Sequence, residues 1–461
     1  MDFSASIDAY KDRIIQDVQR LVKIKSVDDT PKPGMPFGEG IAKALDEALK
    51  ISEELGFSTN NLDGYAGYAE AGQGEEAVGV LVHLDVVPEG LGWQFDPYGA
   101  EISDNKIYGR GTSDDKAPAV ASLYALKAVI DSGAVLTKRV RIIFGTNEEK
   151  GCECIKYYVK KEGHASIGFT PDANFPLIHG EKAIIHGYFH FIDKEEKTSP
   201  YLMDISGGSA INMVADECSA TIVCEQESGI KEKFNSYLKS NDLTGEYKHY
   251  ENKIEIKIIG KSSHGSKPDE GVNAISHMTA FIKVLNLNFG SEFADLYSKK
   301  IGFSTSGEYL GINEKDSFGS LTFCAGNIKT DGNTITVGCD IRSPITLNPQ
   351  DIINKIKNSL KDTNIKYELH TLKEAIYMEQ DCYLVKTLMQ CYVDITGDTE
   401  NKPYTIGGGT YARSMNNILG FGMLFCGSED TMHKKNEYVE IDKLLLAAKI
   451  YAKAIYRLAS E

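Results

Sequence analysis

About the first 185 residues alternate between segments with helical spacing of apolar residues and short segments that are almost entirely apolar. The segment "GIAKALDEALKISEELGF" is helix-like and ends at Gly56, and the helix-like "APAVASLYALKAVIDSG" is closed by Gly133. The segments "AVGVLVHLD", "RVRIIFGT" and "SIGFTPD" are instead typical of buried strands. Because a strand buried on both faces loses its polar alternation, this pattern predicts an α/β domain with a mostly parallel sheet flanked by helices.

The pattern changes from about Tyr188 onward. "GYFHFID", "KIEIKIIG" and "TITVGCDIR" alternate like half-exposed strands, and helices such as "GVNAISHMTAFIKVLNL" lie among them, which indicates an α+β layer. Later the first pattern returns, with the helix "YLVKTLMQCYVDITG", the strand "GFGMLFCG" and the closing helix "IDKLLLAAKIYAKAIYRLA". A chain of 461 residues is long enough for more than one core. We therefore expect one domain formed by residues 1–186 and 381–461, with a second domain, residues 187–380, inserted into it.

The charge balance limits the possible partners. The chain has 66 acidic and 50 basic residues, a net charge of −16, which repels nucleic acid and anionic membranes but not a metal cation. The N-terminal segment lacks the features of a secretory signal, and the most apolar stretch, "AVGVLVHLDVV", is too short and too charged to cross a bilayer. We therefore expect a cytoplasmic protein, with no membrane or nucleic-acid partner, whose nine cysteines are reduced.

Polar side chains stand at the ends of three predicted strands. His83 and Asp85 finish the first strand, Glu148 and Glu149 follow the second, and Asp172 ends the third. Ligands of an open parallel sheet gather beyond the carboxyl ends of its strands. We therefore expect these side chains to converge.

A further pair of acids, Asp114 and Asp115, lies in the Gly-flanked loop "YGRGTSDDKAP" directly before a predicted helix. Borderline cations take imidazole and carboxylate ligands together, and a carboxylate beside His83 can fix the tautomer of its ring. Taken singly, each of these residues is more often a helix cap or a hydrogen-bonded group. As a set placed at strand ends, they favour a metal site.

The segment "TNEEKGCEC" contains two candidate reactive pairs. In a turn, Glu148 and Glu149 can diverge, so that one binds a cation while the other moves a proton. The alternative is that "EEK" is a solvated run of charges. Cys152 and Cys154 lack the second close cysteine pair that a structural zinc site needs, and they are more typical of the start of a helix.

Several segments together resemble a known family in composition and order. They are "VLVHLDVVPEGLGW", "IYGRGTSDDKAP", "FGTNEEKGCECIKYY", "FTPDANFPLIHGEK", "GKSSHGSKPDEGVNA", "IGGGTYAR" and "DTMHKKNEY". The chain is similar over nearly its whole length to co-catalytic zinc metallopeptidases of the aminoacylase and glutamate carboxypeptidase superfamily (peptidase family M20), above all to the PepV-type dipeptidases. The resemblance implies a zinc-peptidase catalytic domain with an inserted, enlarged α+β lid domain.

The resemblance also implies roles for individual residues at a centre of two divalent ions, zinc first, with manganese or cobalt as alternatives. Glu148 would be the general base and acid, and Asp85 would be the partner that orients a liganding histidine. The implied metal ligands are His83, Asp114 and Asp172 for one ion, and Asp114, Glu149 and His433 for the other.

In this family the inserted domain closes over the substrate. The resemblance implies that His264 stabilises the oxyanion, while Arg342, Asn212, Gly408 and Gly409 hold the C-terminal carboxylate of a small peptide. The inserted segment is nearly twice one lid unit, which suggests two ferredoxin-like halves. The resemblance to PepV-type enzymes implies that the second half replaces a dimer partner, so we expect a monomer.

The expected activity is hydrolysis of unblocked dipeptides by a bridging hydroxide that two divalent ions activate. One alternative is an N-acyl-amino-acid deacylase of the same superfamily, and another is a catalytically silent binding protein on this fold. The sequence departs from the family pattern at Ala117, Ala215 and Cys426, where the family has glycine, proline and proline. None of these positions is an implied ligand, so the departures bear on substrate preference.

Overall fold

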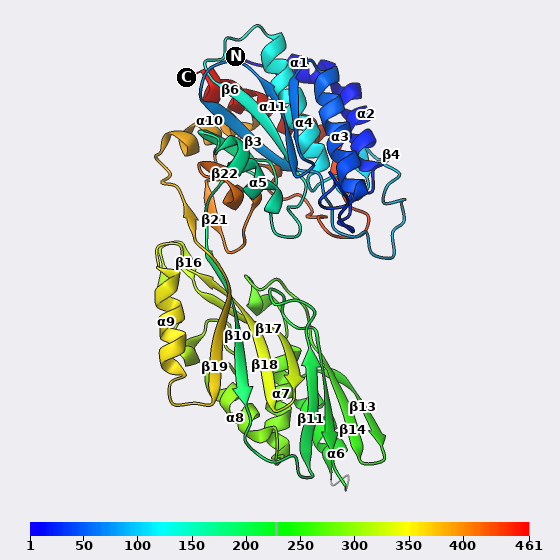
Figure 1. The fold of residues 1–461 in the computed structure, drawn as a ribbon, viewed down its shortest axis with the longest axis vertical. Helices are drawn as coiled ribbons and strands as arrows, with labels where there is room; N and C mark the ends of the chain where they lie inside the picture. Colours follow the sequence, from blue (N-terminus) through cyan, green and yellow to red (C-terminus); the bar gives the residue numbers. More distant parts are fainter. Residues whose placement is uncertain (226–228, 461) are drawn as a thin grey trace. The chain divides into compact units, whose positions relative to one another are not determined.

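The computed structural model describes residues 1–225 and 229–460, and the chain divides into two compact units (Figure 1). Unit 1 consists of Met1–His179, Met378–Tyr404 and Gly409–Glu461, and unit 2 consists of Gly180–Tyr377 and Thr405–Gly408. Each unit has a hydrophobic core of its own. The short return at Thr405–Gly408 differs from the expected boundaries, because the carbonyl oxygen of Ile406 accepts a hydrogen bond from the backbone N–H of Lys182.

The main sheet of unit 1 is mixed. Its central strands run parallel to one another, and the strands toward its edges pair antiparallel. The near-continuous apolar sequences belong to the central strands, which are buried on both faces. The strand order is β1 (Ser58–Leu62), β2 (Ala66–Ala71), β6 (Arg139–Gly145), β3 (Ala77–His83), β7 (Ile167–Thr170), β22 (Ile418–Gly420) and β9 (Ile178–Glu181).

Helices cover both faces of this sheet. On one face, Val78, Val80 and Val82 of β3 join the core that contains α4 and α11, whereas Leu81 joins the core on the other face with α5. His83 alternates with Val82 and so points to the same face as Leu81, toward the edge-on ring of Tyr411. The helices of unit 1 are α1 (Ser4–Ala9), α2 (Lys11–Val22), α3 (Glu39–Glu54), α4 (Lys116–Asp131), α5 (Glu153–Glu162), α10 (Tyr383–Thr396) and α11 (Ile441–Ser460), with the 3-10 turn η3 (Tyr411–Ser414).

The prediction of a single strand over "GFGMLFCG" is wrong. β22 ends at the first residue of the segment, Gly420, the separate short strand β23 (Met423–Leu424) follows, and the two strands belong to different sheets. Gly422 separates them with a φ of +83°, and a Cβ atom at this position would lie 2.4 Å from the ring of Phe175. β23 pairs with β8 (Ala173–Asn174), and a further small sheet contains β4 (Glu101–Ser103), β5 (Lys106–Tyr108) and β24 (Tyr438–Glu440).

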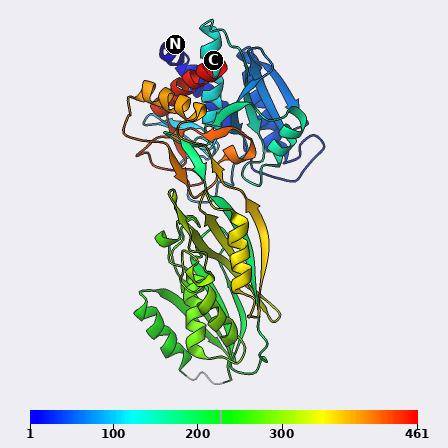
Figure 2. The same ribbon diagram turned by 90° about the vertical axis from the view of Figure 1, so that its left-hand side faces the viewer.

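Unit 2 is built on one long antiparallel sheet. Along β14, Ile254, Ile256 and Ile258 are buried while their neighbours are partly or fully exposed, so one face of the strand is covered. Helices α6 to α9 contribute to the same core and cover that face (Figure 2). The strand order is β13 (Thr244–Tyr250), β14 (Lys253–Ile259), β12 (Glu217–Val223), β11 (Tyr201–Gly207), β17 (Thr322–Asp331), β18 (Thr334–Ser343), β10 (Ala183–Ile192) and β19 (Ile365–Lys373).

Two helices of unit 2, α7 and α9, begin at asparagine side-chain caps. The side chain of Asn273 accepts hydrogen bonds from Ile275 N and Ser276 N at the start of α7, and Asn348 does the same for Gln350 N at the start of α9.

In the described part of the chain, no helix combines the length and the apolar character needed to cross a membrane. The remaining elements are α6 (Ile230–Ser240), α7 (Ala274–Leu285), α8 (Ser291–Lys300), α9 (Pro349–Ser359), η1 (Pro268–Glu270), η2 (Glu308–Leu310), β15 (Lys315–Asp316), β16 (Gly319–Ser320), β20 (Ile376–Tyr377) and β21 (Tyr404–Ile406).

Candidate metal centre

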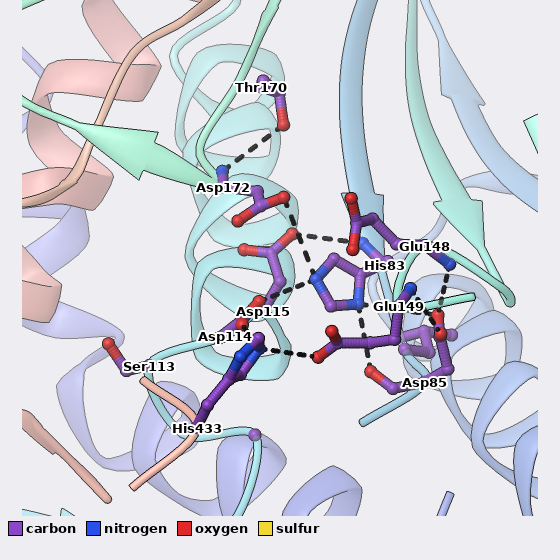
Figure 3. A network of polar contacts seen from close by, with 12 residues as sticks. His83, Asp85, Ser113, Asp114, Asp115, Glu148, Glu149, Thr170, Asp172 and His433 are labelled. Atoms are coloured by element: carbon purple, nitrogen blue, oxygen red, sulfur yellow. Dashed lines mark hydrogen bonds and ion pairs between the residues drawn. The ribbon is translucent and has the colours of Figure 1, made fainter. Parts of the chain in front are cut away.

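Carboxylates and imidazoles from separate loops of unit 1 gather at the carboxyl ends of its parallel strands (Figure 3). His83 is the last residue of β3, Asp172 lies two positions after β7, and Glu148 and Glu149 follow β6. Because β6, β3 and β7 are parallel neighbours, their ends meet at one edge of the sheet. Asp114 reaches the same place from the loop that precedes α4.

The first group of metal-type donors consists of His83, Asp114 and Asp172. Each offers one ligand atom, and these atoms lie within 4.8 Å of one another. The Nε2 atom of His83 lies 2.7 Å from Oδ1 of Asp114 and 3.9 Å from Oδ2 of Asp172. One imidazole and two carboxylates form a donor set that suits zinc and similar cations.

The second group consists of Asp114, Glu149 and His433, whose ligand atoms also lie within 4.8 Å of one another. The Nε2 atom of His433 lies 2.9 Å from Oδ2 of Asp114 and 3.0 Å from Oε1 of Glu149. Asp114 therefore turns Oδ1 toward the first group and Oδ2 toward the second. A carboxylate placed in this way can bridge two metal ions.

Burial and repulsion perturb the pKa values in this cluster. Burial, reinforced by the charge of Asp114, raises the pKa of Asp172 well above its usual range. Burial also raises the pKa of Glu148 to about 7, although the charge of His83 opposes the shift. The hydrogen bond to Asp114 is the main cause that raises the pKa of His433 to about 11. The carboxylates of the cluster, which are buried or half-buried, thus outnumber the imidazoles that could compensate them, and divalent cations would supply the missing positive charge.

Asp85 connects the histidine of the first group to the two glutamates. Its Oδ1 accepts a hydrogen bond from Glu148 N at 3.0 Å, and its Oδ2 accepts one from Glu149 N at 3.1 Å. The backbone carbonyl of Asp85 lies 3.0 Å from Nδ1 of His83, and its Oδ1 lies 3.5 Å from the same nitrogen. If Nδ1 carries the proton, Nε2 is left as a lone-pair donor directed at the first group.

We expect Asp85→Ala to lower metal affinity or turnover by roughly 10- to 100-fold, because the Glu148–Glu149 turn would lose both of its carboxylate acceptors. Asp85→Asn keeps one acceptor oxygen, so its effect should be smaller. Metal titration by calorimetry and steady-state rates would measure the effect, with circular dichroism to check the fold. Unchanged affinity and unchanged turnover in a folded Asp85→Ala protein would contradict this role.

Two residues support the cluster without belonging to either donor group. Oδ2 of Asp115 accepts a hydrogen bond from the backbone N–H of His83 at 3.1 Å. Tyr411 is fully buried, and its ring meets the imidazole of His83 edge-on at 5.8 Å between centroids. A Cβ atom at Gly145 would lie 1.7 Å from the hydroxyl oxygen of Tyr411, so only glycine fits there. The role of Tyr411 was missed in the sequence, although "IGGGTYAR" contains it.

The cysteines of "TNEEKGCEC" have local roles. Cys152 precedes α5 with a φ of +59°, and its Sγ contacts the backbone oxygen of Glu148 at 3.7 Å. Cys154 is buried, with its Sγ 3.3 Å from the hydroxyl of Tyr411. Among the residues that the structure describes, neither donor group contains a cysteine.

Four of the five predicted substrate-binding residues belong to unit 2, and Gly409 belongs to unit 1. Within unit 2, the buried carboxylate of Asp340 holds Arg342 through Nε and Nη2 at 2.8 Å each. The loops of Asn212 and His264 are joined, because Gly265 N donates to the backbone oxygen of Asn212 at 2.7 Å. Nη1 of Arg342 also donates, at 3.3 Å, to the backbone oxygen of Gly407, which is next to Gly408, the fourth of these unit 2 residues. The roles of these residues toward a substrate stay predictions.

Comparisons with known proteins identify the family of the chain. "Putative dipeptidase YtjP" from Bacillus subtilis is 37% identical over 468 residues, covering 100% of both chains, and "Putative dipeptidase SSP1012" from Staphylococcus saprophyticus is 36% identical, covering 98% of both. The crystal structure of human carnosine dipeptidase 1 has the same fold, with a TM-score of 0.58 and 16% identity over 99% of this chain and 98% of that one. The sequence profile of Peptidase family M20/M25/M40 matches residues 79–457. The chain therefore belongs to peptidase family M20/M25/M40.

Proposed function

We propose that this peptidase is a metal-dependent dipeptidase that hydrolyses unblocked dipeptides. The observation that carries the proposal is the pair of donor groups that share Asp114, beside a glutamate that belongs to neither group. The dipeptidase names of relatives that match the whole chain support the same substrate class.

The donor sets fit two divalent ions. His83, Asp114 and Asp172 would hold one ion, and Asp114, Glu149 and His433 the other. Ions held there would polarise the scissile carbonyl and lower the pKa of the attacking water. Zinc is the first choice for imidazole and carboxylate donors, and manganese and cobalt are the alternatives.

Glu148 has the position of a proton shuttle. Its backbone N–H is held by Asp85, its half-buried side chain lies beside the donor groups, and it belongs to neither of them (Figure 3). We assign to its carboxylate the proton of the attacking water, which it then delivers to the departing amine. The neighbouring Glu149 contributes to the second donor group, so the two glutamates divide proton transfer and metal binding between them.

From unit 2 we assign His264 to the oxyanion and Arg342 and Asn212 to the C-terminal carboxylate of the dipeptide, with the backbone of Gly408 and Gly409. A guanidinium that Asp340 already orients loses little side-chain freedom when it binds a carboxylate. The eight-stranded sheet of unit 2 supports an enlarged lid, and we assign the active form to a monomer.

A parallel assay of unblocked dipeptides and N-acetylated amino acids tests this proposal, with the apoprotein reconstituted in turn with zinc, manganese and cobalt. We expect a higher kcat/KM for the unblocked dipeptides. The opposite preference would identify an N-acyl-amino-acid deacylase. Failure to bind any of the three metals would favour the remaining alternative, a catalytically silent binding protein on this fold.

A further inference from the structure

A buried ion pair outside both donor groups connects the loop of Asp114 to the segment of His433. Glu437 is fully buried and lies four positions after His433, and Arg110, which is 2% exposed, lies four positions before Asp114. Oε2 of Glu437 accepts a hydrogen bond from Nη1 of Arg110 at 2.6 Å. The pair therefore joins two segments that are more than three hundred residues apart in sequence.

The other carboxylate oxygen of Glu437 holds the backbone of the loop itself. Oε1 accepts hydrogen bonds from Gly111 N at 3.1 Å, from Ser113 N at 2.9 Å and from Asp114 N at 3.2 Å. The backbone oxygen of Glu437 accepts a fourth, from Gly109 N at 2.9 Å. A single residue thus satisfies most of the donors of the turn that presents the shared carboxylate.

Arg110 makes further contacts besides its ion pair with Glu437. Its Nη2 lies 3.4 Å from the backbone oxygens of Pro88 and Glu89, and its guanidinium lies 5.3 Å from the ring centroid of Trp93. Trp93 in turn donates to the backbone oxygen of Glu89 at 2.6 Å. These contacts keep the guanidinium in place, so Glu437 meets a fixed partner.

The segment from His433 to Glu437 has little freedom of its own. His433 and Asn436 both have left-handed backbones, with φ values of 60° and 57°. The side chain of Asn436 accepts a hydrogen bond from Gln94 N at 2.7 Å. Since Glu437 fixes the end of this segment, displacement of Glu437 would also displace the imidazole of His433.

We propose that Glu437, held by Arg110, is a positioning residue that sets the distance between Asp114 and His433 and thereby the affinity of the second metal ion. The inference rests on the proposed metal centre. Glu437 is linked to two residues of the second group, Asp114 and His433, but to only one residue of the first group, Asp114. Loss of Glu437 should therefore weaken the binding of the second ion more than the binding of the first.

Stepwise metal titration tests this positioning role. We expect wild-type protein to bind two zinc ions, Glu437→Gln to bind the second about tenfold more weakly, and Glu437→Ala about 100-fold more weakly. The effect of glutamine should be the smaller one, because glutamine keeps one side-chain oxygen that accepts hydrogen bonds from the backbone N–H groups, whereas alanine has none. The dissociation constant of the first ion should change much less in both variants.

Glu70→Gln is the matched control. Glu70 pairs with Arg139 and Arg141 in unit 1, so its loss removes ion pairs without touching the loop of Asp114. A generally weakened fold would affect both ions in every variant. Thermal melting shows which variants are folded, and if Glu437→Ala is unfolded, Glu437→Gln decides alone.

The outcomes separate the two proposals. If wild-type protein binds neither zinc nor manganese nor cobalt, the metal centre itself is refuted. If wild-type protein binds two ions, and a folded Glu437 variant binds both with unchanged affinity, the positioning role of Glu437 is refuted while the metal centre stands.

Discussion

Glu148→Gln is expected to lower kcat for dipeptide hydrolysis by roughly 100- to 10,000-fold while the protein keeps both metal ions. The substitution preserves the shape of the side chain but removes the group that accepts and returns a proton. Glu148 belongs to neither donor group, so metal content should not change. Steady-state rates on an unblocked dipeptide and metal content measured on the same sample would check both parts of the prediction.

The adjacent Glu149→Gln variant provides the control. Oε1 of Glu149 lies 3.0 Å from Nε2 of His433 in the second donor group, so loss of this carboxylate should weaken the binding of one metal ion. Two neighbouring glutamates would then give opposite results, one losing rate with metal retained and the other losing metal. A near-normal kcat in Glu148→Gln would refute its assignment as the proton shuttle.

The strand ends could be predicted from the sequence because hydrophobic periodicity is local. The all-apolar strands predict where His83, Glu148 and Asp172 stand, and the rule for parallel sheets then brings their side chains together. Asp114 also lies where a Gly-flanked loop meets a helix. This part of the site can therefore be predicted from the sequence pattern alone.

The rest of the site depends on contacts between distant parts of the chain. Nothing near His433 marks it as a ligand, and its role could be inferred only from the resemblance to a family. Tyr411 and Glu437 were missed because each acts through a contact with a residue more than two hundred positions away, Tyr411 by packing against Gly145 and Glu437 by its ion pair with Arg110. The division of "GFGMLFCG" was missed for a similar reason, since Gly422 is constrained by the ring of Phe175.

Asp114→Asn is expected to remove both metal ions, because Asp114 is the one residue that the two donor groups share. An amide binds cations more weakly than a carboxylate does, and both ions would lose the same negative ligand. Loss of metal removes several kcal/mol of transition-state stabilisation, so turnover should fall by at least about 1000-fold. Metal titration and rates on a dipeptide would measure the two effects.

Thermal stability offers an independent measurement of the same prediction. Ions that bind only the folded protein stabilise it by about 2.7 kcal/mol per site at a free concentration of 100 times Kd. The Tm of wild-type protein should therefore rise when zinc is added to the apoprotein, and the Tm of Asp114→Asn should rise far less.

Single-group variants show whether Asp114 acts as a bridge. Asp172→Asn affects only the first group and His433→Ala only the second, so each should retain one ion and part of the zinc-dependent rise in Tm. If Asp114→Asn also retained one ion at normal affinity, it would behave like a ligand of a single site. The shared carboxylate could not then hold two ions at once, and the activation of water between them would have to be abandoned.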